Sequence, residues 1–317
     1  MLIRARINVC RMKRGLILTG AEDKVLRLWS AESYNSLDEY AVPDMNPLVD
    51  YDFDEGKIVG LSSGRMCILR RNGKRSILQF CEASSTRGLC MRYIDPEAVV
   101  GCDDGRARVL DMYTGRCSRI IRMHGGPLTC IDLTEDQLIF GGSTFGTVSV
   151  ADLSTGELLA SLKSSCSPTG IKSLHFNMHS HLLFAGSTAG YAHCWDLRTL
   201  RPLWETRVSP NVIYSVHHLL GDTSTLALGG LDGILRLVDQ NTGEFLSSVL
   251  MDSTSSGSST TSSKAIETKR ARSLGEGVHV DSIPRSLRPP ITCLAVGLNK
   301  IVTTHNEKYI KMWRFDK

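Results

Sequence analysis

Histidine and cysteine are the side chains of this chain that could bind a metal ion, so their spacing comes first. The histidines include two close pairs, His179 with His181 and His217 with His218. The ten cysteines form no Cys-x-x-Cys pair, and no His-Glu-x-x-His motif is present. Structural zinc sites and disulfide frameworks both need denser spacing. We therefore expect neither a metal site nor a disulfide framework.

Other chemical motifs are also missing from the sequence. It contains no Gly-x-Ser-x-Gly, no phosphate-binding loop and no pair of carboxylates at a distinctive spacing. We expect a protein that is not an enzyme and needs no cofactor. The net charge is +4, from 37 Lys and Arg against 33 Asp and Glu, which is too small to indicate nucleic acid binding.

The chain gives no sign of a membrane segment or a secretory signal. No apolar run approaches the roughly 20 residues that cross a bilayer. The opening "MLIRARINVCRMKRG" is basic but lacks a continuous apolar segment. We expect a cytoplasmic or nuclear protein.

The pair Trp195-Asp196, followed by Arg198, is one copy of a repeated pattern. The segment "AGSTAGYAHCWDL" aligns without gaps with "LTGAEDKVLRLWS", "VGCDDGRARVLDM", "FGGSTFGTVSVADL" and "LGGLDGILRLVDQ", and two weaker copies are "GLSSGRMCILRR" and "TTHNEKYIKMWRF". Successive copies are 40 to 44 residues apart, except for an interval of 75 before the last. The position of Trp195 is occupied in the other copies by Trp29, Leu69, Leu110, Ala151, Val238 and Trp313. A fixed period of this length is typical of repeat architectures.

Each copy has the alternation of a β-strand with unlike faces. Apolar residues such as Leu26 and Leu28 flank Arg27, and the same pattern surrounds Arg108 and Arg236. Gly-containing turns such as "YTGR", "STGE" and "NTGE" follow, and further apolar strands lie on either side. Four short strands in about 40 residues form the unit of a β-propeller blade. Small residues recur at one strand position, where we expect core cysteines: Cys10, Cys90, Cys130 and Cys293.

These segments resemble the WD-repeat family, whose blades end in Trp-Asp and whose junctions carry a His and a tight-turn Asp. The resemblance implies an all-β, seven-bladed β-propeller with four-stranded antiparallel blades. We expect the blades at residues 7–40, 48–80, 88–121, 128–162, 171–206, 213–250 and 291–317.

The resemblance also implies structural roles for several residues. Turn aspartates are Asp23, Asp104 and Asp232, with Glu307 as a fourth acidic version. His124, in "HGGPLTCI", is the candidate for a buried His that partners a turn Asp. Ser63, Phe145 and Ala189 fill the same turn position elsewhere. The tryptophans of the repeat, Trp29, Trp195 and Trp313, are expected to pack between blades.

The long interval before the last copy contains an insertion at residues 252–289. It begins "DSTSSGSSTTSSK", which cannot bury enough apolar surface to offset the entropy of ordering it. We expect a mostly disordered linker between blades 6 and 7. Its basic part, "KRARS", is alternatively a nuclear-import patch or a kinase site at Ser273.

The two ends of the chain break the pattern. Only "MLIRAR" precedes Ile7, and the last blade ends after its third strand with "KMWRFDK". In this family a strand from one terminus usually completes the blade built by the other. We expect a last blade with three good strands and an open edge that is prone to pairing with another chain.

A rigid propeller with variable loops favours the binding of proteins or peptides. Basic residues beside the Asp turns, namely Lys24, Arg65, Arg106 and Lys308, form a candidate face for an acidic or phosphorylated peptide. Ordinary solvated turns are the alternative explanation of these charges.

Resemblance within the family suggests two more specific roles. The chain is similar to plant F-box/WD proteins, which present substrates to a cullin-RING ubiquitin ligase, although it contains no F-box segment. Trp195, Asp196 and Arg198 also resemble a WDxR box that docks on the adaptor of a different cullin, with Ala189 where an acidic residue is usual. A scaffold of an unrelated complex remains the third possibility.

Overall fold

The computed structural model describes residues 6–42, 48–62, 64–71, 73, 75–79, 86–164, 169–220, 224–250, 266–268, 272–273, 283–297 and 300–314. The chain divides into two compact units. Unit 1 comprises Met1–Glu39, Ala189–Tyr191 and Thr206–Lys317, and unit 2 comprises Tyr40–Thr188 and Ala192–Glu205. In the described part of the chain no helix is long and apolar enough to cross a membrane.

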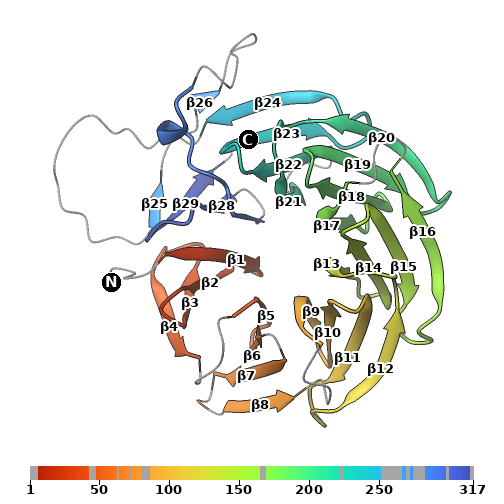
Figure 1. Cartoon of the computed structure of the whole chain (residues 1–317). Coiled ribbons are helices and arrows are strands. Elements are labelled where there is room, and N and C mark those ends of the chain that lie inside the picture. The colour runs from red at the N-terminus through yellow and green to blue at the C-terminus, as the bar shows by residue number, and fades with distance from the viewer. Residues whose placement is uncertain are drawn as a thin grey trace. The chain divides into compact units, whose positions relative to one another are not determined.

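Seven sheets follow one another along the chain, and we number them as blades 1 to 7 (Figure 1). Blade 2 contains β5 (Asp50–Phe53), β6 (Lys57–Ser62), β7 (Arg65–Arg70) and β8 (Arg75–Gln79), and blade 3 contains β9 (Gly88–Ile94), β10 (Glu97–Cys102), β11 (Arg106–Asp111) and β12 (Cys117–Arg122). Blade 4 contains β13 (Leu128–Leu133), β14 (Leu138–Ser143), β15 (Thr147–Asp152) and β16 (Leu158–Lys163). Blade 5 contains β17 (Ile171–Asn177), β18 (Leu182–Ser187), β19 (Tyr191–Asp196) and β20 (Arg201–Arg207).

Blades 1, 6 and 7 have the same plan, with additions from the insertion. Blade 1 contains β1 (Ile7–Lys13), β2 (Leu16–Ala21), β3 (Val25–Ser30) and β4 (Ser36–Ala41). Blade 6 contains β21 (Ile213–His218), β22 (Thr225–Gly230), β23 (Ile234–Asp239) and β24 (Phe245–Leu250). Blade 7 contains β27 (Cys293–Val296), β28 (Lys300–Thr304) and β29 (Ile310–Arg314). The predicted all-β, seven-bladed propeller is therefore confirmed, with three chain-consecutive strands in the last blade.

The burial of the strands follows their apolar content. The second strand of each blade is buried almost throughout, as in β18, because sheets cover both of its faces. The outer strand is largely exposed, as in β4, where only Tyr40 is half-buried. Inner strands alternate more, as in β13. The apolar content of a strand therefore indicates whether it is an inner, middle or outer strand of its blade.

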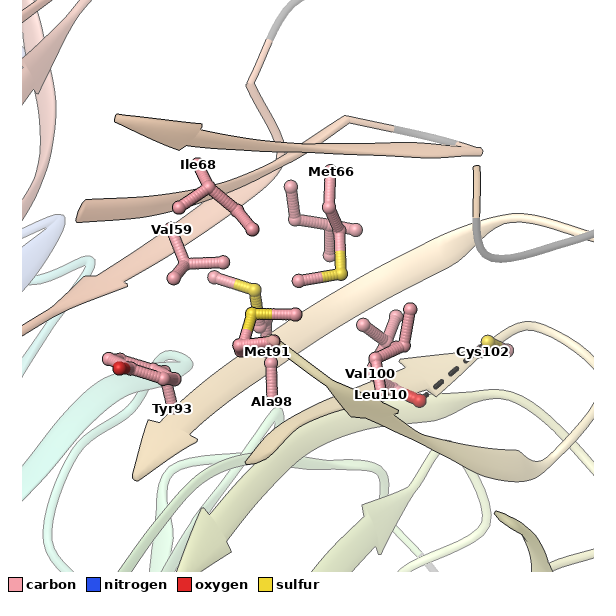
Figure 2. Packing of buried hydrophobic residues seen from close by; sticks show 11 residues of the cluster. Val59, Met66, Ile68, Met91, Tyr93, Ala98, Val100, Cys102 and Leu110 are labelled. Atoms are coloured by element: carbon pink, nitrogen blue, oxygen red, sulfur yellow. Dashed lines mark hydrogen bonds between the residues drawn. The ribbon is translucent and has the colours of Figure 1, made fainter. Parts of the chain in front are cut away.

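Apolar side chains fill the space between successive blades. Between blades 2 and 3 of unit 2, Val59, Met66 and Ile68 pack against Met91 and Val100 (Figure 2). Similar clusters join blade 3 to blade 4 and blade 4 to blade 5. In unit 1, Ile17 and Trp29 of blade 1 pack with Val302 and Met312 of blade 7.

Glycine is required at the turn between the second and third strands. Gly105 has a φ of +77°, which side chains other than glycine rarely adopt. A Cβ built there would lie 2.3 Å from the backbone oxygen of His124. That oxygen belongs to the segment that leads into the next blade, so the glycine allows two backbones to touch.

The insertion contributes strands that the sequence does not predict. The segment β25 (Ile266–Thr268) pairs in parallel with β29, as the outermost strand of the blade 7 sheet. The segment β26 (Arg272–Ser273) pairs with β24 as a fifth strand of blade 6 (Figure 1). A 3-10 helix, η2 (Arg285–Leu287), precedes β27. The rest of 252–282 lies outside the described residues, so the expectation of a mostly disordered linker stays a prediction.

Candidate functional site

The turn aspartates hold arginines of the following strand. Asp23 lies 2.7 Å from Arg27, and Asp104 lies 2.9 Å from Arg108, in each case four residues later. Each carboxylate also accepts the backbone N–H two residues ahead, as Asp104 does from Arg106. Arg27 and Arg108 are buried. These aspartates therefore anchor buried guanidinium groups within their own blades.

The third pair, in blade 6, is the most deeply buried. An oxygen of Asp232 lies 2.6 Å from Nη1 of Arg236, and the side chain of Asp232 is fully enclosed. Ser209 donates a further hydrogen bond to the same carboxylate at 2.8 Å. Sequence analysis identified both residues of each pair but not their contact. The signal was present, because an Asp-x-x-x-Arg spacing recurs in blades 1, 3 and 6.

The pKa shifts of Asp104 and Arg108 in blade 3 agree with this structural role of the turn aspartates. Burial alone would raise the pKa of Asp104, but hydrogen bonds from Arg108 and from the Arg106 N–H bring it below its ordinary value. The same contact with Asp104 raises the pKa of the Arg108 guanidinium. Both groups are therefore charged at neutral pH, and the pair is an ion pair rather than a neutral hydrogen bond.

His124 has partners other than the expected aspartate. Its Nε2 lies 2.8 Å from the carbonyl oxygen of Gly141, while Nδ1 lies 3.2 Å from Oγ1 of Thr147 and 3.3 Å from Oγ of Ser149. The turn position of that blade holds Phe145, so no carboxylate is available there. Burial lowers the pKa of His124, which favours the neutral ring that these hydroxyl contacts need.

The tryptophans of the repeat are buried, and each belongs to an apolar cluster that joins two neighbouring blades. Nε1–H of Trp29 donates to Oγ1 of Thr19 at 2.9 Å, and Nε1–H of Trp313 donates to Thr303 at 3.3 Å. Trp195 instead stacks on His193, with ring centroids 5.4 Å apart. With exposures of 3%, 1% and 1%, these three side chains have no surface to offer a partner.

The WDxR box differs from the other pairs in exposing its arginine. Trp195 and Asp196 are buried at the end of β19. Two hydrogen bonds, of 3.0 and 2.9 Å, join the guanidinium of Arg198 to Asp196, yet 64% of the Arg198 side chain is exposed. The Arg198 hydrogen bond holds the pKa of Asp196 below its usual range. Asp196 therefore orients a charged group that faces solvent.

Blade topology separates the two candidate surfaces. In an antiparallel sheet of four consecutive strands, the first and third turns share one end and the second turn lies at the other. Arg198 follows β19 and so lies at the first end of blade 5, where the backbone N–H of Leu197 donates to His181 of the β17–β18 turn. Met178 and Leu200, exposed by 40% and 48%, lie in the same two turns. We call Met178, His181, Arg198 and Leu200 the blade 5 end patch.

The predicted basic residues lie at the other end of their blades. Lys24 and Lys308 are exposed in second turns of unit 1, and Arg65 and Arg106 are exposed at second turns of unit 2. Within each unit the two residues therefore occupy equivalent turns of two blades. The convergence of all four remains a prediction.

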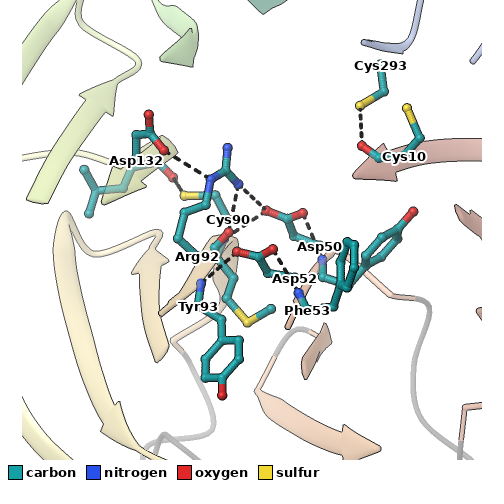
Figure 3. Close-up of polar contacts among 12 residues, drawn as sticks. Cys10, Asp50, Asp52, Phe53, Cys90, Arg92, Tyr93, Asp132 and Cys293 are labelled. Atoms are coloured by element: carbon teal, nitrogen blue, oxygen red, sulfur yellow. Dashed lines mark hydrogen bonds and ion pairs between the residues drawn. The ribbon is translucent and has the colours of Figure 1, made fainter. Parts of the chain in front are cut away.

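A set of inner-strand carboxylates was missed by sequence analysis (Figure 3). Asp50 and Asp52 of β5 accept the backbone N–H groups of Met91 and Tyr93 on β9, at 3.0 and 2.9 Å. Arg92 lies between two carboxylates, 3.7 Å from Asp50 and 3.5 Å from Asp132. These carboxylates satisfy the unpaired edge of the neighbouring inner strand, which is a structural task. A similar aspartate recurs two blades later, where Asp132 of β13 accepts the N–H of Phe176, and this recurrence was the available signal.

The histidine pairs do not assemble a metal site. Over the described ranges, no group of three or more His, Cys, Asp or Glu side chains could hold a metal ion. The pair His179 and His181 lies in and beside the exposed β17–β18 turn, and His217 and His218 end β21. The candidate site therefore consists of exposed charged side chains on turns that the blades hold in place.

Comparisons with known proteins complete the description of the site. No family model matches the chain. It is 47% identical to an F-box/WD-40 repeat-containing protein of Arabidopsis thaliana over 333 aligned residues, which cover 98% of this chain and 73% of the relative. It is 30% identical to human transducin-like enhancer protein 6 over 115 residues, covering 36% of this chain and 20% of that protein.

A solved structure shares the fold. The crystal structure of the computationally designed Ika8 protein matches with a TM-score of 0.66 over 99% of this chain and 98% of that chain, at 16% sequence identity. Identity this low shows a likeness of fold alone.

Proposed function

The chain belongs to the WD-40 repeat family, whose propellers are protein-interaction scaffolds, and we propose that it is the substrate-recognition subunit of a cullin-RING ubiquitin ligase. The observation that carries this proposal is the alignment with an F-box/WD-40 repeat-containing relative across nearly the whole propeller. The F-box/WD type of receptor joins a substrate-binding propeller to a ligase, and this chain supplies the propeller.

The substrate would bind at the second-turn end of the blades. Arg106 is exposed there, directly after the Asp104 turn that Arg108 anchors. A fixed backbone beneath an exposed guanidinium suits recognition of carboxylate or phosphate groups, because little ordering is needed on binding. Lys24, Arg65 and Lys308 occupy equivalent turns, so an acidic or phosphorylated peptide is the substrate class that the charges favour.

The blade 5 end patch supports a second candidate, attachment to the adaptor of a different cullin. Arg198 is exposed and held in place by Asp196, and exposed Met178 and Leu200 lie in the adjoining turns. A fixed charge beside apolar side chains is a common composition for a protein interface. Ala189 departs from the box, so this candidate stands second to the F-box/WD assignment.

One experiment distinguishes these proposals. The protein is tagged at its own gene, as the wild type and as the variants Arg106→Glu, Arg198→Glu and Arg116→Glu, and the partners purified with each form are quantified by mass spectrometry. Arg116 is an exposed cation at the first-turn end of blade 3, so its variant controls for the charge change alone.

The variants have separate expected results. Arg106→Glu should lose substrate proteins while cullin components remain, because the adaptor does not use that end. Arg198→Glu should retain all partners if the ligase is of the F-box type, and should lose the cullin if the WDxR box docks. Absence of any cullin from every sample would contradict both ligase proposals and favour a scaffold of another complex.

A further inference from the structure

The second turn of blade 4, between β14 and β15, carries an exposed aromatic ring where other blades carry an aspartate. Phe145 occupies the turn position that Asp104 holds in blade 3, and it is 62% exposed. In blade 3 the carboxylate at this position binds the buried Arg108 and accepts the backbone N–H of Arg106. A phenyl ring can do neither, so blade 4 must hold its turn in another way.

Ser143 performs the task of the missing carboxylate. Its Oγ accepts the backbone N–H groups of Phe145 and Thr147 at 3.2 and 3.3 Å, and it lies 2.8 Å from Oγ1 of Thr147. The third-strand position that holds Arg108 in blade 3 holds Ser149 here, so no guanidinium at that position needs a carboxylate. The side chain of Phe145 therefore has no part in holding its own turn, and its apolar character calls for another explanation.

Glycines form the surface beside this ring. A Cβ built at Gly126 would lie 2.3 Å from Cε2 of Phe145, so the ring lies against the backbone there. A Cβ built at Gly125 would meet no described atom within 4 Å, so the space at that residue is open. A Cβ built at Gly105 would lie 2.8 Å from the carbonyl oxygen of Gly126. The Phe145 ring and the turn of blade 3 that leads into Arg106 therefore both contact Gly126.

Exposed cations lie at the same end of blades 3 and 4. Arg106 pairs in register with Arg122 on the outer strand of blade 3, and Thr147 pairs with Lys163 on the outer strand of blade 4. All three cations are exposed. Like charges directly opposite one another, as in Arg106 and Arg122, destabilise a sheet, and a bound anion would offset this repulsion. The turn carboxylate of blade 3 is already paired with a buried arginine. The charges therefore favour an acidic ligand.

We propose that Phe145 is a specificity-determining residue of the substrate site, and that it receives a large apolar side chain from an acidic segment of the substrate. Acidic groups of that segment bind Arg106 and Lys163, while the apolar side chain covers the Phe145 ring beside Gly125. Aromatic rings suit this role because they supply a large contact area at a low cost in conformational entropy. The inference rests on the proposed function and deepens it, because it adds an apolar requirement to a substrate class defined by charge alone.

The test measures peptide binding to the purified full chain. The probes are four labelled peptides of the series AEEXEEA, in which X is Leu, Phe, Ser or Gly, and fluorescence anisotropy gives their affinities. Phe145→Ser removes the ring, and Lys163→Glu reverses a charge at the same blade end. Tyr113→Ser is the matched control, because Tyr113 is an aromatic residue exposed by 71% at the opposite end of blade 3.

The variants have different expected results. The wild type and Tyr113→Ser should bind the Leu and Phe peptides at least about fivefold more tightly than the Ser and Gly peptides, because an apolar side chain leaves water. Phe145→Ser should lose this preference and still bind all four acidic peptides. Lys163→Glu should weaken the binding of all four and keep the preference. The thermal unfolding midpoint of Phe145→Ser should equal that of the wild type, because Ser143 holds the turn.

Other results would overturn the inference. A wild type that binds none of the four peptides or binds them equally would do so, as would a Phe145→Ser variant that keeps the preference. A wild-type dimer in light scattering that dissociates in Phe145→Ser would assign the ring to contact with a second copy of the chain instead.

Failure of this inference is distinguishable from failure of the proposed function. Purification of Phe145→Ser with its cullin and an unchanged set of substrates would contradict the role of Phe145 alone. Absence of any cullin, together with a preserved preference for the Leu and Phe peptides, would contradict the ligase proposal alone.

Discussion

Two aspartate–arginine pairs of this protein have similar geometry in opposite surroundings. Asp232 and Arg236 in blade 6 are 2.6 Å apart, with side-chain exposures of 0% and 7%. Asp196 and Arg198 in blade 5 are 2.9 Å apart, with exposures of 10% and 64%. Distance alone therefore does not say what such a pair does. Burial makes the first a structural element, and exposure leaves the second available to a partner.

The largest effect should come from breaking the buried pair. Asp232→Ala leaves Arg236 buried without its carboxylate, so the free energy of unfolding should fall by about 3–5 kcal/mol. Urea unfolding of the purified chain measures this change. The double variant Asp232→Ala, Arg236→Met should recover much of the loss, and a double variant as unstable as the single one would show that the charge is not the cause.

A buried histidine in blade 7 extends the comparison to a group that is buried without charge. The Nε2 of His305 lies 2.9 Å from the Thr303 hydroxyl, and its Nδ1 lies 3.2 Å from the Pro289 carbonyl oxygen. Burial, with a smaller effect of Lys311, lowers its pKa to about 4. An unfolded histidine has a pKa of about 6.5.

This difference in pKa sets a pH dependence of stability. Between pH ~6.5 and ~4 the unfolded chain takes up a proton that the folded chain does not, so stability is lost as the pH falls, by up to ~3 kcal/mol. The contribution is complete above this window. Unfolding curves across it should show the loss in the wild type and in the exposed control His179→Gln. A His305→Gln variant that keeps the same pH dependence would refute the assignment.

A pair of intermediate burial should give an intermediate effect. The side chain of Asp104 is 30% exposed, while that of its partner Arg108 is 8% exposed. Water can partly replace the carboxylate, so Asp104→Ala should lower the unfolding free energy by roughly 1–3 kcal/mol. Urea unfolding of the Asp104→Ala and Asp232→Ala variants under the same conditions measures both losses. An equal loss in both variants would break the proposed dependence on burial.

The smallest effect on stability is expected in the pair whose arginine is exposed. Arg198→Glu should leave the thermal unfolding midpoint unchanged, because solvent already surrounds the guanidinium. Differential scanning calorimetry checks this, with Arg116→Glu as the matched surface change. A large drop for Arg198→Glu would show that the WDxR pair is structural, and any accompanying loss of partners would then have no bearing on docking.

The candidate site was partly predictable from the sequence. The turn aspartates and the exposed positions of Lys24 and Arg106 follow from the repeat and its turns. The contacts of those aspartates with Arg27, Arg108 and Arg236 were not predicted, since strand alternation only places these arginines on the polar face of their strands. The aspartate partner predicted for His124 is wrong: Phe145 fills the turn position of its own blade, and the ring contacts Gly141, Thr147 and Ser149 instead. Asp50 acts on a neighbouring blade, which alternation within one strand cannot reveal.

The sequence by itself determined the seven blades, because strand alternation, turn glycines and the period of the repeat are encoded within a few neighbouring residues. Only the tertiary structure decided which side chains meet across blades and that part of the insertion pairs with β29. Such contacts join residues far apart in the chain, as in the backbone pairing of β25 with β29 or the hydrogen bond from the Met91 N–H to Asp50. Their free energy depends on burial and register, which exist only once the sheets have packed against one another.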